Sequence, residues 1–138
     1  MPDQMQWLYP WMHVFGRLFF SLLFISSGIA HLKRLGPMSE YAASKGIPAP
    51  KLAVAFTGIV ILSGGLLVLI GWTRFIGVGL LFLFLIPAAF LIHPYWKETD
   101  PANRELEKAH FYKNIALAGA ALLIAYYGGG YWPLSFGG

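Results

Sequence analysis

The stretch LAVAFTGIVILSGGLLVLIGWTRFIGVGLLFLFLIPAAFLI, residues 52–92, carries a single charged side chain, Arg74. A helix that crosses a bilayer needs about 20 predominantly apolar residues, because the hydrocarbon core is roughly 30 Å thick. The stretch is about twice that long, so it predicts two crossings, residues 52–72 and 75–92, joined by a turn at Thr73 and Arg74. The fold is therefore expected to begin from a helical hairpin in a membrane.

Two more apolar stretches flank this hairpin. They cover residues 11–32 and 111–132. The whole chain is 57% hydrophobic and only 12% charged, against about 25% charged in an average soluble domain. We therefore expect an all-α membrane protein, a single domain over residues 1–138 built as a bundle of four transmembrane helices.

The two long connections also carry helix signals. In the first, Pro37 suits an early helical position, and Gly46 followed by Pro48 suits a stop. This pattern predicts a short interfacial helix. In the second, Asp100 precedes a proline and is an N-cap signal, and no helix breaker follows before Tyr127.

The basic residues predict how the chain is oriented. Eight of the ten Lys and Arg residues lie in or beside the two long connections: Lys33, Arg34, Lys45, Lys51, Lys97, Arg104, Lys108 and Lys113. Positive charge in short loops marks the cytoplasmic side. Both long loops should therefore be cytoplasmic and both termini outside, in what we expect to be a bacterial cytoplasmic membrane. A net charge of +4 is ordinary for such a topology, and we expect no nucleic acid partner.

Small residues recur two helical turns apart in the predicted spans. They form three pairs: Ser21 with Gly28, Gly58 with Gly65, and Gly64 with Gly71. Small faces of this kind let helix backbones approach closely. These residues predict helix packing, not a reactive site.

Several classes of chemistry are excluded by what the chain lacks. It contains no Cys, which rules out thiolate chemistry and Cys-ligated metal centres within the chain. It contains no Walker sequence, no dinucleotide-binding glycine motif and no HExxH. None of the four predicted spans holds an Asp or Glu. An ordinary ion-coupled transporter is therefore disfavoured, as is a small-solute permease, for which these spans show no continuous polar path.

Arg17 is the one ionisable residue well inside a predicted span. It either extends to the outer headgroups or contacts an anion or a quinone oxygen inside the bundle.

A second group of polar residues falls where the topology brings helix ends together, at the cytoplasmic edge. It consists of His31, His93, Trp96, Lys113 and Asn114. Two imidazoles on different helices suit a b-type haem, a metal, or a hydrogen bond to a quinone carbonyl. A polar pocket that binds a quinone or a lipid ranks above haem, and we assign no metal. An aromatic belt with a lysine reaching the interface explains the same residues without any ligand.

The order of these blocks resembles that of the DoxX-like family of four-helix membrane proteins. The blocks are GRLFFSLLFISSGIAHL, GIPAP, TGIVILSGGLLVLIGWTR, HPYW and FYKNIALAGAALLIA. The resemblance implies association with membrane oxidoreductase complexes, including a quinone-reducing thiosulfate oxidoreductase and an assembly with superoxide dismutase and a sulfurtransferase. Many members have no assigned reaction.

This chain departs from the family at one position. Members often have a Glu three residues before the glycine pair, where this chain has Ile61. The departure weakens the case for independent catalysis, and the sequence leaves open whether the protein is an enzyme. We expect a subunit or accessory factor of a membrane redox complex, with a purely structural or assembly role in a larger complex or a homo-oligomer as the alternative.

Overall fold

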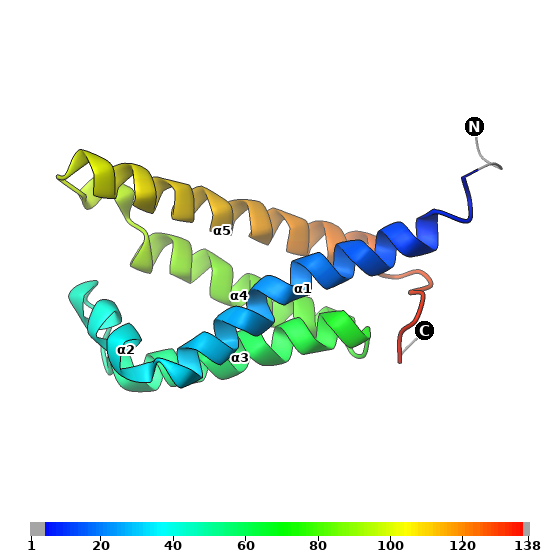
Figure 1. Cartoon of the computed structure of the whole chain (residues 1–138), viewed down its shortest axis with the longest axis horizontal. Helices are drawn as coiled ribbons and strands as arrows, with labels where there is room; N and C mark the ends of the chain where they lie inside the picture. The colour runs from blue at the N-terminus through cyan, green and yellow to red at the C-terminus, as the bar shows by residue number, and fades with distance from the viewer. Residues whose placement is uncertain (1–4, 137–138) are drawn as a thin grey trace.

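The computed structural model describes residues 5–136, and over that range the chain is helical with no strand. Five α-helices and one short 3₁₀ helix follow one another (Figure 1): α1 Tyr9–Lys33, α2 Leu35–Ser44, α3 Pro50–Ile70, α4 Arg74–Ile92, η1 Tyr95–Lys97 and α5 Pro101–Tyr127.

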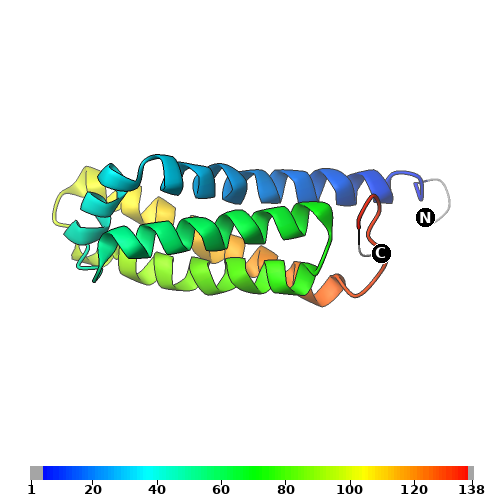
Figure 2. The ribbon, with the colours of Figure 1, turned by 90° about the horizontal axis from the view of Figure 1, so that it is seen from below.

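Four long helices make an elongated bundle, with α2 folded across one end. Helix α3 packs against α1, α2 and α4, and α4 packs against α5. The two termini lie at one end of the bundle, and α2 and the α4–α5 connection lie together at the other (Figures 1 and 2). We call these the terminal end and the α2 end.

The predicted hairpin is confirmed by the α3–α4 connection. Helix α3 ends at Ile70 because Gly71 follows in the left-handed conformation, with a φ of 72°. Helix α4 begins at Arg74, directly after Thr73, which also has a positive φ of 43°. Three residues therefore suffice to reverse the chain between two apolar helices.

Glycines mark the places where helix backbones approach most closely. A Cβ atom on Gly28 would lie 2.9 Å from the carbonyl oxygen of Gly58, so α1 and α3 pack against each other at these two positions. Gly65 also faces α1, and Gly64 faces Leu81 of α4. The two glycine faces of α3 therefore serve two different neighbours.

The outer surface of the bundle is strongly apolar. Large side chains such as Phe19, Leu52 and Leu83 are each more than 60% exposed. Three helical segments are long and apolar enough to cross a membrane: Tyr9–Lys33, Pro50–Ile70 and Arg74–Lys97. Helix α5 falls outside this set because its first turns carry several charges and only residues 115–125 are continuously apolar.

Most helix ends lie within two residues of the sequence-based boundaries. The short helix in the first loop is present, but it begins at Leu35 and holds Pro37 in its first turn. Helix α5 begins after Asp100, whose side chain accepts a hydrogen bond from the Asn103 backbone N–H, as the N-cap signal predicted. It ends at Tyr127, where three consecutive glycines follow, so the last five residues of the predicted span 111–132 lie beyond the helix.

Candidate functional site

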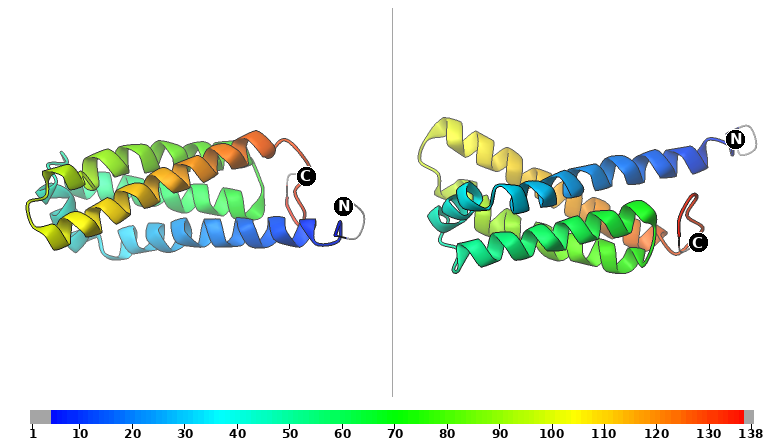
Figure 3. Two further views of the ribbon diagram at one scale, coloured as in Figure 1. Left: turned by 90° about the horizontal axis from the view of Figure 1, so that it is seen from above. Right: turned by 60° about the horizontal axis from the view of Figure 1, so that its bottom comes forward.

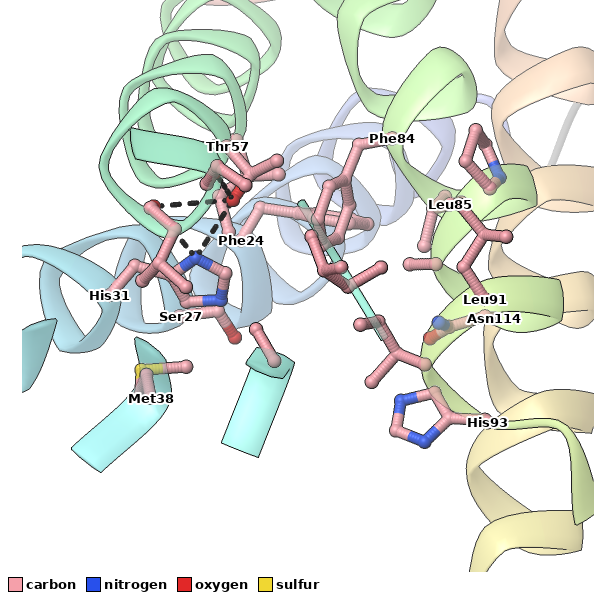
Figure 4. Close-up of a pocket in the computed structure, with 18 of the residues that line it drawn as sticks. Phe24, Ser27, His31, Met38, Thr57, Phe84, Leu85, Leu91, His93 and Asn114 are labelled. Carbon is pink, nitrogen blue, oxygen red and sulfur yellow. Dashed lines mark hydrogen bonds between the residues drawn. The ribbon is translucent and has the colours of Figure 1, made fainter. Parts of the chain in front are cut away.

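A cavity of about 440 Å³ lies inside the α2 end of the bundle. Side chains from all five α-helices line it. The lining is mainly apolar, as the close-up in Figure 4 shows. Its polar members are Ser27, His31, Tyr41, Thr57, His93, Lys113 and Asn114.

His31 is held on the α1–α3 wall of this cavity. Its Nδ1 atom lies 3.2 Å from the Thr57 hydroxyl, and that hydroxyl donates to the Ala53 carbonyl at 2.8 Å. Because the hydroxyl proton is used in that bond, Nδ1 of His31 acts as the donor to Thr57. In the neutral ring, Nε2 is then an acceptor. Figure 4 shows the ring between Thr57 and Ser27.

His93 lies on the α4–α5 wall, where Figure 4 places it close to Asn114. Its Nδ1 atom donates to Oε2 of Glu107 at 2.7 Å, because an ionised carboxylate only accepts. The ring also stacks on His110, with ring centroids 5.1 Å apart. These contacts fix the orientation of the imidazole and leave Nε2 as its remaining hydrogen-bonding atom.

Glu107 joins three parts of the fold. Its side chain accepts from His93 and from the Tyr41 hydroxyl, the latter at 2.8 Å, and Lys45 Nζ lies 3.7 Å from the same carboxylate. Burial opposes ionisation of this side chain, but the hydrogen bonds from His93 and Tyr41 and the nearby charges outweigh it, so the pKa of Glu107 lies below its ordinary value. Burial and the hydrogen bond to Glu107 raise the pKa of Tyr41.

Lys45 extends this polar network to the α4–α5 connection. Its ammonium group lies 3.0 Å from a carboxylate oxygen of Glu98. The network therefore links α2 to the end of α4 and to α5, and it closes one side of the cavity.

Ile61 is fully buried and lines the same cavity. This is the position at which the DoxX-like family often has a Glu. On α1, Gly28 is level with Ile61, because a Cβ atom on Gly28 would meet the adjacent Leu62. Arg17 is about three helical turns from that level, roughly 16 Å at 1.5 Å per residue. An acid at position 61 would therefore belong to this cavity and would not pair directly with Arg17.

The structure brings together four of the five residues that the sequence groups at one edge of the bundle. His31, His93, Lys113 and Asn114 all line the cavity. Trp96 does not; it lies outside in an aromatic cluster, with its ring centroid 5.7 Å from that of Phe111 and 6.1 Å from that of Phe90.

Arg17 lies in a different place from the other five residues. It lines a second cavity, of about 390 Å³, at the terminal end of the bundle. The sequence analysis also kept Arg17 apart from the group of five.

Sequence reasoning missed the network residues Tyr41, Lys45 and Glu107. A signal for Glu107 was present, because it lies seven residues before Asn114 and eleven before Ala118, and all three are buried on one face of α5. That spacing places Glu107 on the inward face of the helix and not among the solvated charges of the loop. No comparable signal marks Lys45.

The cavity has the composition of a site for an apolar molecule with one polar end. Its apolar walls would hold a hydrocarbon or aromatic body, and His31 and His93 offer hydrogen bonds from opposite helix pairs. Glu107 holds the proton on Nδ1 of His93, so Nε2 of the neutral imidazole is an acceptor.

Comparison with known proteins gives two matches. The family described as DoxX matches residues 12–94. Inner membrane protein YphA of Escherichia coli (strain K12) is similar to this chain, with 30% identity over 122 residues, which cover 88% of this chain and 86% of that protein. No solved structure matches. The family match ends before α5, so Glu107, Lys113 and Asn114 lie outside it.

Proposed function

This chain is an integral membrane protein of the DoxX family, and from that premise we propose that it is a subunit or accessory factor of a membrane redox complex. In this proposal the cavity at the α2 end binds a quinone-like molecule, and the rest of the bundle anchors the site in the bilayer.

The observation that carries the proposal is the pairing of His93 with Glu107 in the wall of a cavity that is otherwise mainly apolar. The cavity volume of about 440 Å³ is within the range of roughly 300–1,000 Å³ that is usual for small-molecule sites. A quinone combines an apolar body with carbonyl oxygens, which matches this lining. When bound, it would supply a two-electron acceptor.

The role of the chain itself is to bind and orient. Nε2 of His93 would accept a hydrogen bond from a hydroxyl of the reduced, quinol form, because Glu107 holds the imidazole in place and keeps the proton on Nδ1. His31 would offer a second contact from the α1–α3 wall. Glu107 does not line the cavity, so it acts through His93 as a positioning residue.

The proposed setting is a four-span bundle in a bacterial cytoplasmic membrane. The second half of α5 would be the fourth span, because it packs along α4 and is apolar over residues 115–125. The basic residues around the α2 end favour a cytoplasmic position for that end, with both termini outside. The cavity would then open near the cytoplasmic surface.

Equilibrium binding of a short-chain quinol to the purified protein in lipid nanodiscs tests this function. We expect saturable binding of decylubiquinol, about three- to tenfold weaker in His93→Ala, as the loss of one hydrogen bond predicts. Trp96→Ala is the matched control, because Trp96 lies at the same end of the bundle but outside the cavity. Equal affinities in His93→Ala and the wild type, at equal folded fraction, would refute the site.

A purely structural or assembly role is the second candidate. It is favoured by Ile61, which removes from the cavity the acid that related proteins often carry. Mass measurement of the intact assembly after mild detergent extraction distinguishes the two: a larger protein partner without any saturable quinone binding would support the structural role.

A further inference from the structure

A second site is built around Arg17 at the terminal end of the bundle. The side chain is 7% exposed, although it carries a permanent charge. One of its nitrogens, Nη2, donates to the Leu134 carbonyl at 2.9 Å. The other two, Nε and Nη1, have no hydrogen-bond partner among the described residues.

Two other polar atoms near Arg17 are also buried without a hydrogen-bond partner within the described part of the chain. They are Nδ1 of His13 and Oγ of Ser21. His13 and Arg17 both line the cavity of about 390 Å³, together with apolar residues of α1, α3 and α5. A buried cation with one carbonyl partner is costly unless an anion neutralises it.

The described chain supplies no such anion at this end. Its acidic residues all lie on α2, in the α4–α5 connection or in the first two turns of α5, at the opposite end of the bundle: Glu40, Glu98, Asp100, Glu105 and Glu107. Instead, a second arginine is close by. The guanidinium carbons of Arg17 and Arg74 lie 5.6 Å and 5.0 Å from the ring centroid of Trp132.

The shape of this cavity indicates what could enter it. Trp132, only 3% exposed, forms part of its wall, and the C-terminal tail folds against this end of the bundle (Figure 3). Other lining residues, Met12, Leu123 and Tyr127, are more than half exposed on the apolar outer surface. The cavity is thus continuous with the face of the bundle that contacts lipid chains.

We propose that this cavity binds the phosphate group of an anionic phospholipid, with Arg17 as the principal phosphate contact and the acyl chains lying between α1 and α5. A guanidinium group suits this role because its planar array of donors matches a phosphate. The site is at the opposite end of the bundle from the proposed quinone cavity and does not depend on it.

Native mass spectrometry of the full chain, titrated with phosphatidylglycerol in mild detergent, tests this site. We expect one tightly held lipid per chain, with affinity at least about tenfold lower in Arg17→Gln, as the loss of a charge-assisted contact predicts. Arg34→Gln is the matched control, because it makes the same charge change at an exposed position at the α2 end and should leave the affinity unchanged.

A second variant tests the lipid site without changing the charge of Arg17. Gly16 lines the cavity, and a Cβ atom there meets nothing within 4 Å. Gly16→Leu should therefore fill the cavity, retain the fold and lower lipid affinity while Arg17 remains. Lipid affinities within twofold of the wild type in both Arg17→Gln and Gly16→Leu would overturn the proposal.

Three further outcomes would also overturn it. Stronger Arg17-dependent binding of oleate than of phosphatidylglycerol would show that the ligand is a carboxylate. Binding of inorganic phosphate as tight as that of phosphatidylglycerol would show that the site does not require a lipid. Asp3 lies outside the described residues, and if Asp3→Asn destabilises the lipid-free protein as much as Arg17→Gln does, the anion belongs to the chain.

Discussion

Replacing Glu107 tests whether the polar network holds the α2 end together. Glu107 is 8% exposed, and its carboxylate accepts hydrogen bonds from His93 at 2.7 Å and from Tyr41 at 2.8 Å. Hydrogen bonds to a charged group contribute about 1.5–3 kcal/mol each. Glu107→Ala removes both and leaves two buried donors without an acceptor, so we expect the free energy of unfolding to fall by about 3–5 kcal/mol.

Glu107→Gln removes the negative charge of this side chain while keeping its size and shape. Glu107→Gln keeps one acceptor oxygen for Tyr41 but presents an NH₂ group to Nδ1 of His93, so a loss of about 1–3 kcal/mol is expected. Glu105→Gln makes the same charge change on the exposed face of α5 and should stay within about 0.5 kcal/mol of the wild type. Equilibrium unfolding in mixed micelles measures all three variants.

The stabilisation by Glu107 should also depend on pH with a defined sign. Because the pKa of Glu107 is lowered in the folded protein, its contribution is complete above the unfolded-state pKa of about 4.3. It is lost as the pH falls through the lower folded-state pKa. The difference in stability between wild type and Glu107→Gln should therefore shrink on acidification below about pH 4.3.

Amide hydrogen exchange shows which helices are destabilised when Glu107 is replaced. Amides of α2 should exchange faster in Glu107→Ala than in the wild type, while those of the α3–α4 hairpin should change little, because the network ties α2 to the rest of the bundle. If Glu107→Ala and Glu105→Gln have equal free energies of unfolding, and the amides of α2 exchange at the wild-type rate in Glu107→Ala, the polar network does not hold α2 against the bundle.

Three further predictions concern packing and topology. Gly58→Ala should destabilise the protein by about 1–3 kcal/mol, because the new Cβ would lie 2.8 Å from Cβ of His31; Gly119→Ala, where nothing lies within 4 Å, is the control, and equal thermal unfolding would contradict the prediction. Trp132→Ala should cost about 3–5 kcal/mol, because this side chain is 3% exposed within the core; a change below about 1 kcal/mol would show that the tail is not part of the core. Single cysteines at Lys45 and Arg104 should both resist an impermeant thiol reagent added to intact cells, and labelling of either from outside would reverse the proposed orientation.

The sequence by itself determined the helical membrane fold. The length and apolarity of residues 52–92 predicted the α3–α4 hairpin, because a bilayer sets the length of a helix that crosses it. The proline and glycine positions located α2 to within two residues, and Asp100 located the start of α5. These features could be predicted because they depend on local backbone chemistry and on the thickness of the bilayer.

Only the tertiary structure decided which polar residues share a cavity. Periodicity shows which face of a helix is buried, but the depth at which two helices meet depends on where their small residues allow contact, here at Gly28 and Gly58. That packing places His31 and His93 in one cavity and Arg17 in another. It also brings Glu107 from a charged loop-proximal turn into the interior beside His93, a pairing across the end of the bundle that no local pattern encodes.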